Sequence, residues 1–362
     1  MTGRLMRWWA VTGVLVAVMG LLSAGCAQGQ APDSAATDDA WLVLPYAAYA
    51  PETKLSGGLV VGWYAPPQGG YASNVQGLVT VTQRRQVIVQ VQPDVYLRGG
   101  RWRVLGEVQG SYFPDTFYGV GGDTPTSFAT DYTSTEALLD VAVQRRITAG
   151  WHAGPRLLSR YERITALEEL PPGQAALAGR ERSWVLGLGG VFTRDRRDNR
   201  YFPRRGSFAE ASLLGVTRLL AGGRVFAQSR IDLRAYRPWG PGIAAAQLYG
   251  EATMGQPPFS LLPQLGGPDV LRGYREGRFR DRVYWAAQAA YRLPLFWRFK
   301  AVAFGSVGEV AGGLTPDLVG DLAFAAGGGG RLRLTDGGVH GRIDLAYGSG
   351  GWQLYLSMLE AF

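Results

Sequence analysis

The residue types that usually carry enzymatic or metal chemistry are few and widely separated in this chain of 362 residues. His152 and His340 are the only histidines, and Cys26 is the only cysteine. This spacing argues against a histidine-based metal cluster, and a single cysteine argues against a thiolate site or a disulfide within the chain. No Gly-x-Ser-x-Gly elbow occurs, which argues against a lipase-type nucleophile. We therefore predict no enzymatic activity, no metal and no cofactor.

A run of glycines could suggest a phosphate-binding loop, but its surroundings do not fit one. Residues 327–330 lack the following Lys-Ser/Thr pair and lead into the alternating stretch 331–334. We expect these glycines to permit a bend or close packing against a loop that plugs the fold. Asp and Glu are scattered over polar faces without a recognisable catalytic pair.

The chain is basic, with a formal net charge of +8. Lys54 and Lys300 are the only lysines, so arginine carries nearly all of the positive charge. A basic balance suggests nucleic acid or an anionic membrane as a partner. The export signal described next argues against nucleic acid, which leaves the phosphates of lipopolysaccharide and phospholipid headgroups. An equally good explanation is that arginines line a polar lumen and pair with acids there.

The N-terminal residues have the order of a secretory signal. Arginines precede an apolar stretch, residues 8–22, which is shorter than the roughly 20 residues of a spanning helix. Cys26 follows a small-residue run and resembles the acylated cysteine of bacterial lipoproteins, although Ser23 replaces the usual leucine. Acylation of Cys26 and ordinary cleavage a few residues later both remain open. We predict a signal peptide over residues 1–26.

The chain after the signal divides into a short leader and a long patterned region. Residues 27–40 are small and polar without periodicity, which predicts a flexible periplasmic leader, too short for a periplasmic transport-associated module. From Trp41 onward, apolar and polar residues alternate in segments of about ten residues, the length of a tilted transmembrane strand. A soluble β-sandwich could also alternate. Aromatic residues near the strand ends, together with the export signal, favour a membrane barrel over residues 41–362.

The turn signals divide this region into about sixteen strands, an even number within the range of bacterial barrels. The longest connections, 113–134, 162–180, 255–281 and 307–321, all follow odd-numbered strands. Short turns at one end and long loops at the other are typical of an outer-membrane barrel. The predicted fold is therefore all-β, a single transmembrane antiparallel barrel with both termini in the periplasm. The predicted strands are 41–49, 55–64, 75–83, 87–97, 101–112, 135–147, 149–161, 181–193, 206–216, 224–236, 242–254, 282–294, 297–306, 322–334, 340–347 and 351–361.

The final predicted strand alternates apolar and polar residues and is followed by a phenylalanine. This pattern resembles the C-terminal signal read by the outer-membrane insertion machinery, which makes that machinery an expected partner during biogenesis. Glu360 interrupts the apolar face near its end. The residues assigned to the signal, all expected on one face, are Trp352, Leu354, Leu356, Met358 and Phe362.

The connection after the predicted eleventh strand carries the most specific motif of the chain. Residues 265–281 resemble the sixth extracellular loop of the BamA/TamA-like barrels of the bacterial surface antigen family, with its Arg-Gly-aromatic tip. The family also places this loop after the eleventh strand, so motif and topology agree. The resemblance implies an inward-folded loop that plugs the barrel, with the Arg272 guanidinium offering its donors to the lumen wall. The motif residues are Leu271, Arg272, Gly273, Tyr274, Gly277, Arg278, Phe279 and Asp281.

Other stretches extend the resemblance over most of the chain after the leader. Residues 45–55 resemble the family's opening hairpin, residues 117–125 resemble a family loop, and residues 195–206 resemble the turn before the ninth strand.

One departure from the family concerns the partner of the loop arginine. Phe304 and Gly308 match a strand whose family pattern is Phe-x-Asp-x-Gly, but Ser306 replaces the acid here. In the family that acid helps to hold the loop arginine in the lumen, so Arg272 needs another partner or is held more loosely. The candidate partners are Ser306, Asp232 and Asp344, which we place on polar strand faces.

Three functions fit the resemblance. The first is an outer-membrane barrel with a role in membrane biogenesis or in transport of protein or lipid, through an opening seam between its first and last strands. The predicted lack of periplasmic modules argues against a stand-alone insertase. The second is a plugged pore or structural barrel that works with lipids or with a separate periplasmic partner. The third is a barrel enzyme acting on membrane lipids, for which the sequence offers no catalytic constellation.

Overall fold

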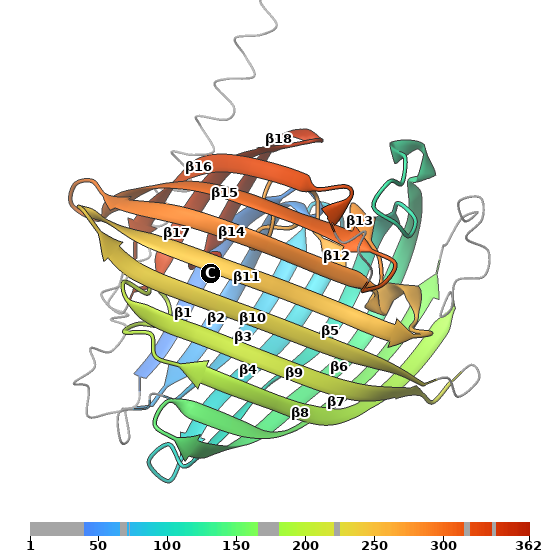
Figure 1. The fold of residues 1–362 in the computed structure, drawn as a ribbon, viewed down its shortest axis with the longest axis horizontal. Coiled ribbons are helices and arrows are strands. Elements are labelled where there is room, and N and C mark those ends of the chain that lie inside the picture. Colours follow the sequence, from blue (N-terminus) through green and yellow to red (C-terminus); the bar gives the residue numbers. More distant parts are fainter. Residues whose placement is uncertain are drawn as a thin grey trace, which may run out of the picture.

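The computed structural model describes residues 40–65, 71, 73–165, 181–220, 225–314, 319–334 and 338–362. The predicted signal peptide with Cys26 lies outside the described residues, as does the leader except for Ala40. Within the described residues, sixteen antiparallel strands close into one barrel, which confirms the predicted fold class (Figure 1).

The barrel strands follow one another around the wall in chain order, with one interruption between the eleventh and twelfth. In that order they are β1 Ala40–Ala50, β2 Lys54–Tyr64, β3 Asn74–Thr82, β4 Val87–Leu97, β5 Trp102–Phe117, β6 Thr130–Thr148, β7 Trp151–Thr165, β8 Arg182–Asp195, β9 Gly206–Arg218, β10 Val225–Trp239, β11 Gly242–Gly255, β14 Val283–Pro294, β15 Phe299–Ala311, β16 Ala323–Arg333, β17 His340–Gly348 and β18 Gly351–Met358. The strands β12 Gln264–Leu265 and β13 Phe279–Arg280 form a separate small sheet inside the loop between β11 and β14, which the sequence did not predict.

Several strands extend further at the end with the long loops than the sequence predicted. β5 and β6 stay paired from Trp102↔Arg145 to Phe117↔Thr130, whereas we predicted a loop over residues 113–134. Turn-type residues such as Pro114 and Asp131 interrupt the apolar pattern there. Backbone pairing needs no apolar side chains, so a strand that continues beyond the bilayer can lose the alternation without losing its hydrogen bonds.

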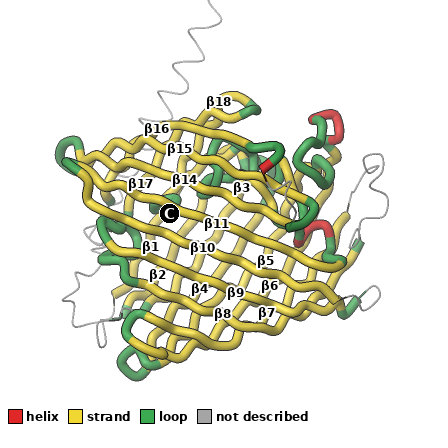
Figure 2. The backbone as a smooth tube through the Cα atoms, in the orientation of Figure 1, coloured by secondary structure: helices red, strands yellow, loops and turns green. Residues whose placement is uncertain are grey.

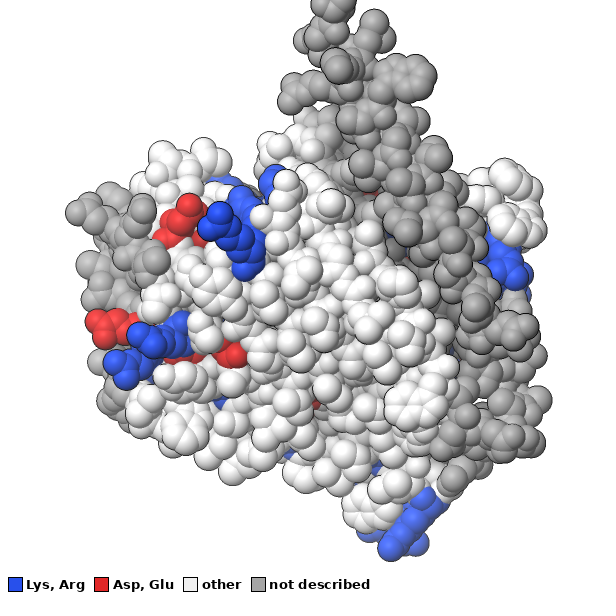
Figure 3. All heavy atoms as spheres, turned by 180° about the vertical axis from the view of Figure 1, so that it is seen from behind, with Lys and Arg blue, Asp and Glu red and all other residues white. Residues whose placement is uncertain are grey.

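The barrel wall has one apolar face and one charged face. Outward side chains include exposed residues such as Leu188, Leu213 and Phe324, while Arg103 and Arg292 are buried on the inner face. Figure 3 shows the wall from behind, with uncharged side chains over its middle and charged side chains near its edges. This distribution fits a lipid-facing exterior and a polar lumen.

Helical structure is confined to short turns. Figure 2 shows the wall as continuous strand, with short helical segments in the loops. They include η1 Thr126–Phe128 and η2 Phe259–Leu261. None of the described helices has the length and apolarity needed to cross a membrane.

Candidate functional site

The loop between β11 and β14 folds back into the barrel. Its base is closed by the β12–β13 pair, where Leu265 lies opposite Phe279. Its tip is buried: Leu271 is 0% and Arg272 is 1% exposed. Leu271 (φ 53°) and Gly273 (φ 118°) both have left-handed backbone, which turns the tip sharply. The tip therefore enters the lumen.

Arg272 is held by a carboxylate on β17. Its Nη1 donates to Asp344 Oδ2 at 2.6 Å, and its guanidinium carbon lies 3.6 Å from the Phe304 ring centroid. The side chains of the pair are 2% and 0% exposed. A buried ion pair with a ring stacked on the guanidinium fixes both the position and the orientation of the tip.

Asp344 is also the centre of a larger network. Arg331 Nη1 donates to Asp344 Oδ1 at 2.6 Å, and Arg342 Nε lies 3.8 Å from Asp344 Oδ2. Arg331 Nε in turn donates to Glu360 Oε1 at 2.9 Å, and Arg292 Nε lies 3.7 Å from Glu360 Oε2. Buried carboxylates and guanidiniums thus form one continuous chain from the loop tip to the last residues of the sequence.

The glycines of β16 leave the space that this network occupies. A Cβ on Gly329 would lie 2.1 Å from Asp344 Oδ1 and 3.1 Å from Arg331 Nη1. A Cβ on Gly327 would lie 2.6 Å from the Phe304 ring. The expected close packing at residues 327–330 is thus found, against the partners of Arg272.

The loop tip also contacts the last barrel strand. Tyr355 on β18 accepts a hydrogen bond at its hydroxyl from Gly273 N (3.1 Å) and donates to Tyr274 O (3.0 Å). A Cβ on Gly273 would lie 2.9 Å from the Ala325 Cβ and 3.1 Å from the Tyr347 carbonyl carbon. Only glycine permits this approach, which brings the tip against β16, β17 and β18 at once.

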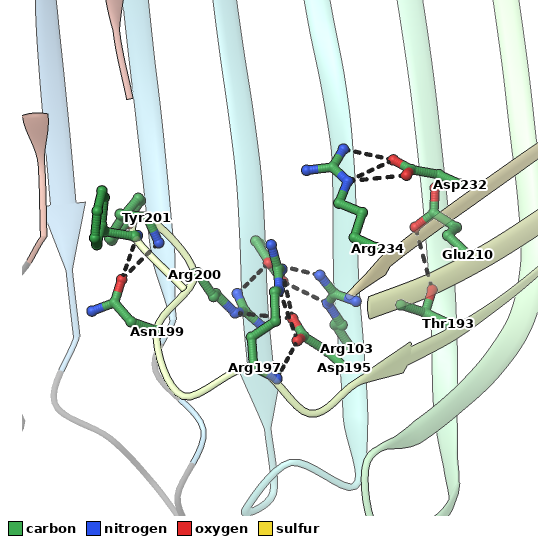
Figure 4. A network of polar contacts seen from close by, with 12 residues as sticks. Arg103, Thr193, Asp195, Arg197, Asn199, Arg200, Tyr201, Glu210, Asp232 and Arg234 are labelled. Atoms are coloured by element: carbon green, nitrogen blue, oxygen red, sulfur yellow. Dashed lines mark hydrogen bonds and ion pairs between the residues drawn. The ribbon is translucent and has the colours of Figure 1, made fainter. Parts of the chain in front are cut away.

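Two of the three candidate partners of Arg272 are engaged elsewhere. Asp232 accepts hydrogen bonds from Arg234, seen in Figure 4, and from Gln247 Nε2 at 2.8 Å. Ser306 Oγ donates to Ala325 O at 3.4 Å. Asp232 is not a partner of Arg272, because the tip lies beside β17 and not beside β10. Ser306 is not a partner either, because its hydroxyl bonds to the neighbouring strand β16.

The rest of the loop motif anchors the loop to its surroundings. Arg278 donates to Thr124 O (2.6 Å) and stacks on Phe279, whose ring lies 4.2 Å from the guanidinium carbon. Gly277 has a left-handed backbone (φ 73°), and Asp281 Oδ1 accepts a hydrogen bond from the following backbone N–H. These residues hold the loop base rather than its tip.

The turn between β8 and β9 folds inward at the opposite end of the barrel. Phe202 and Pro203 are buried, and Asn199 Oδ1 accepts hydrogen bonds from the backbone N–H groups of Tyr201 and Phe202, both at 2.8 Å. Arg200 Nη1 reaches across to Asp94 on β4 at 2.5 Å. Figure 4 shows this turn and its arginines lying against the barrel wall.

The end of the chain departs from its predicted position. β18 ends at Met358, and Leu359 has a left-handed backbone (φ 65°) that turns the chain inward. Phe362 is 3% exposed and packs inside the barrel, where its carbonyl accepts a hydrogen bond from Arg292. Phe362 therefore does not share the outward face. Of the other residues assigned to the insertion signal, Trp352 and Leu354 are exposed on that face, and Leu356 and Met358 are half-buried.

The family model for the Omp85 superfamily domain matches residues 82–349. The chain belongs to the Omp85 superfamily. This assignment confirms the family predicted from the loop motif, and it makes the protein an outer-membrane barrel of the biogenesis and transport class. A comparison with curated protein sequences finds no match.

Solved structures of Omp85 barrels share the fold at low sequence identity. BamA from Haemophilus ducreyi lacking POTRA domains 1–3 has a TM-score of 0.59 and 14% identity, over 88% of this chain and 70% of that one. CdiB from Acinetobacter baumannii has a TM-score of 0.56 and 10% identity, over 90% of this chain and 60% of that one. CdiB from Escherichia coli has a TM-score of 0.54 and 12% identity, over 87% and 62%. The chain thus spans less than two thirds of either CdiB.

The sequence did not predict several residues that hold the plug loop, the segment between β11 and β14. Arg331 and Tyr355 contact the network or the tip directly, and Arg275 pairs with Asp115 at 2.6 Å. Glu360 was read only as an interruption of an apolar face. Arg331 and Tyr355 do stand at the inward positions of alternating strands, so alternation could have marked them as lumen residues, but not as partners of the loop.

A polar chamber of about 620 Å³ remains in the Omp85 lumen beside the plug. Arg156, Arg160 and Arg230 line it, each in an ion pair with a wall carboxylate. A chamber of this size and polarity holds water. Among the described residues, no three His, Cys, Asp or Glu side chains gather as a metal site.

Glu276, on the plug loop, also lines the chamber. Its side chain is exposed to the chamber inside the barrel, and Glu52, Asp115 and Asp269 lie nearby. The surrounding barrel, which limits hydration of the carboxylate, and then repulsion from these acids raise the pKa of Glu276 from 4.5 to about 8. The carboxyl of Glu276 therefore keeps its proton to a higher pH in the docked loop than it would in water.

This raised pKa predicts that the loop docks less firmly as pH rises. Below pH 4.5 the carboxyl is protonated whether the loop is docked or released, so it contributes no pH dependence. Between pH 4.5 and about 8, Glu276 loses its proton in the released loop but keeps it in the docked loop, so release becomes increasingly favourable. Above pH 8 both forms are deprotonated, and the free-energy cost of docking the charged carboxylate no longer changes with pH. We expect more frequent opening events in planar bilayers at pH 8 than at pH 5. Glu276→Gln should flatten this dependence, and an unchanged profile in that variant would assign it to another group.

Proposed function

We propose that this Omp85 barrel opens at the seam between β1 and β18 to pass polypeptide or lipid between its lumen and the bilayer. The observation that carries the proposal is the pairing at the seam. β1 and β18 are in register at Tyr49↔Leu356 alone, whereas β17 and β18 pair continuously from Gly341↔Met358 to Gly348↔Gly351. Among the described barrel strands, the seam is the neighbouring pair with the fewest residues in register.

The composition of β1 supports a weak seam. Pro45 lies within β1 opposite Leu59 of β2, and proline has no backbone N–H to donate. Pro51 lies in the turn that follows β1. Unpaired backbone groups are costly in lipid, so a segment that offers new strand pairing would be favoured at this edge.

The contacts of the plug loop support a role in holding the same seam closed. Tyr355 of β18 is held by the loop tip through its hydroxyl, and Asp344 of the adjacent β17 holds Arg272. While the tip is docked, β17 and β18 are tied to the lumen from inside. In this proposal, release of the tip precedes movement of β18.

A disulfide across the seam is expected to abolish activity. In a Cys26→Ser background, Tyr49→Cys with Leu356→Cys would join the residues that face each other across β1 and β18. The matched control, Leu345→Cys with Leu354→Cys, joins β17 to β18 at a continuously paired position. The measured quantity is the rate at which an unfolded eight-stranded outer-membrane barrel, added in urea, folds into vesicles that contain the protein.

We expect the oxidised seam pair to reduce that rate to the rate of empty vesicles, and reductant to restore it. The control pair should have no effect. Unchanged acceleration with the seam fully crosslinked would eliminate the opening model for polypeptide. Transfer of a fluorescent phospholipid between leaflets, measured in the same vesicles, tests the lipid alternative.

A second candidate function, a plugged pore that works with a separate periplasmic partner, is favoured by segments that fold inward at both ends of the barrel. The loop between β11 and β14 is anchored in the lumen through Arg272 and Asp344, and the turn between β8 and β9 is anchored to the wall through Arg200 and Asp94. A barrel enzyme acting on membrane lipids is not supported by any arrangement of side chains in the described lumen.

A further inference from the structure

Three arginines point outward near the short-turn end of the wall. Arg145 on β6 stands on the same face as Val143 (38% exposed) and Ile147 (64%). Arg194 follows the outward Phe192 on β8, and Arg237 precedes the outward Trp239 (69%) on β10. Because short turns face the periplasm in outer-membrane barrels, these side chains lie at the level of the inner leaflet.

Tryptophans alternate with these arginines around the wall. Trp102 on β5 lies opposite Arg145, and Trp151 on β7 lies opposite Arg194. The Arg194 guanidinium carbon lies 5.0 Å from the Trp151 ring centroid. Tryptophan is enriched where the acyl chains meet the headgroups, so the register places the guanidiniums at headgroup depth. We call this set the arginine–tryptophan row: Trp102, Arg145, Trp151, Arg194, Arg237 and Trp239.

The arginines of the row have no acidic partners in the part of the chain that the structure describes. None of the three forms an ion pair there; Arg194 donates to Ser207 Oγ at 3.5 Å, while its buried Nε has no hydrogen-bond acceptor. The turns at the same end of the barrel carry six further exposed arginines. Asp198 is an exposed acid in these turns. These basic side chains are Arg98, Arg101, Arg146, Arg196, Arg204 and Arg205.

The opposite end of the described barrel has a mixed charge. Its exposed acids lie among exposed arginines. The acids are Asp123, Asp131, Glu181 and Asp321, and the arginines are Arg85, Arg163, Arg182 and Arg282. The excess of positive charge is therefore a property of one end and not of the whole surface.

We propose that the arginine–tryptophan row binds the phosphates of anionic phospholipids in the inner leaflet of the outer membrane. A guanidinium offers paired donors to phosphate oxygens, and the adjacent indole packs on the glycerol and upper acyl region. A lipid fits better than an acidic periplasmic protein, because the three arginines lie along the wall beside exposed apolar residues, Val143, Phe192 and Trp239. The proposal rests on the outer-membrane placement and is independent of seam opening.

Spin-labelled lipids in vesicles of phosphatidylcholine test the proposal through electron paramagnetic resonance. The measured quantity is the association of labelled phosphatidylglycerol with the full chain, relative to labelled phosphatidylcholine. The row variant is Arg145→Gln with Arg194→Gln and Arg237→Gln. The control is Arg98→Gln with Arg204→Gln and Arg205→Gln, which changes the net charge equally but leaves the wall intact. A third variant replaces the three row arginines with lysine.

We expect the wild type to prefer phosphatidylglycerol, and the row variant to lose about fivefold in preference for each arginine removed. The control should keep the preference, and the lysine variant should keep most of it even if the glutamine variant folds poorly. Equal losses in the row and control variants, or no preference in the wild type, would overturn the proposal. A loss confined to the control would also overturn it and would assign the basic end to an acidic soluble partner.

Discussion

Asp344→Asn is expected to release the loop tip and to lower the free energy of unfolding by about 3–5 kcal/mol. Asp344 is 0% exposed and accepts hydrogen bonds from Arg272 and Arg331, whose side chains are also buried. Asparagine keeps the shape but removes the charge that compensates these guanidiniums. Breaking a buried pair costs far more than the pair itself contributes, because the remaining charge stays without water or partner.

Trypsin provides a direct reading of tip release. The loop carries Arg272, Arg275 and Arg278, so a released loop becomes a substrate while a docked one is protected. Asp232→Asn is the matched control, since Asp232 is also a buried carboxylate that pairs with an arginine of the wall, Arg234. It should lower stability without exposing the loop. A protected loop in Asp344→Asn would show that the Phe304 stack and the Tyr355 hydrogen bonds hold the tip without the carboxylate.

Deletion of residues 268–280 is expected to convert a barrel of low conductance into an open channel. The deletion removes the buried loop tip, which lies in the lumen against β16, β17 and β18. Barrels with sixteen strands leave an aqueous interior unless loops fill it. Conductance of the wild type and the variant in planar bilayers measures the effect.

The control for this deletion is the removal of residues 167–179, a connection of equal length at the same end of the barrel. That variant should conduct as little as the wild type. If the 268–280 variant also stays closed, the turn that carries Phe202 and the inward end that carries Phe362 are sufficient to close the barrel. The extracellular loop then would not be the gate, and its proposed role in holding the seam closed would lose its support.

The sequence alone determined the architecture of the wall. Alternation in segments such as residues 282–294 showed which side chains face outward, because successive residues of a strand point to opposite faces. The longest connections all follow odd-numbered strands, which predicted long loops at one end of the barrel and short turns at the other. The Arg-Gly-aromatic motif identified the plug loop. These features are local, and each can be read within a few tens of residues. The full lengths of β5 and β6 were not predicted, because apolar and polar residues no longer alternate at the ends of these strands nearest the long loops.

Contacts across the lumen were decided by the tertiary structure. Asp232, Ser306 and Asp344 all stand on polar faces in sequence, yet Asp344 alone meets Arg272. Alternation assigns a side chain to the lumen, but strand tilt, barrel closure and the path of the loop decide which lumen residues come within reach. The inward turn at Leu359 likewise depends on buried partners from other strands, Arg292 and Arg331, which no local pattern specifies.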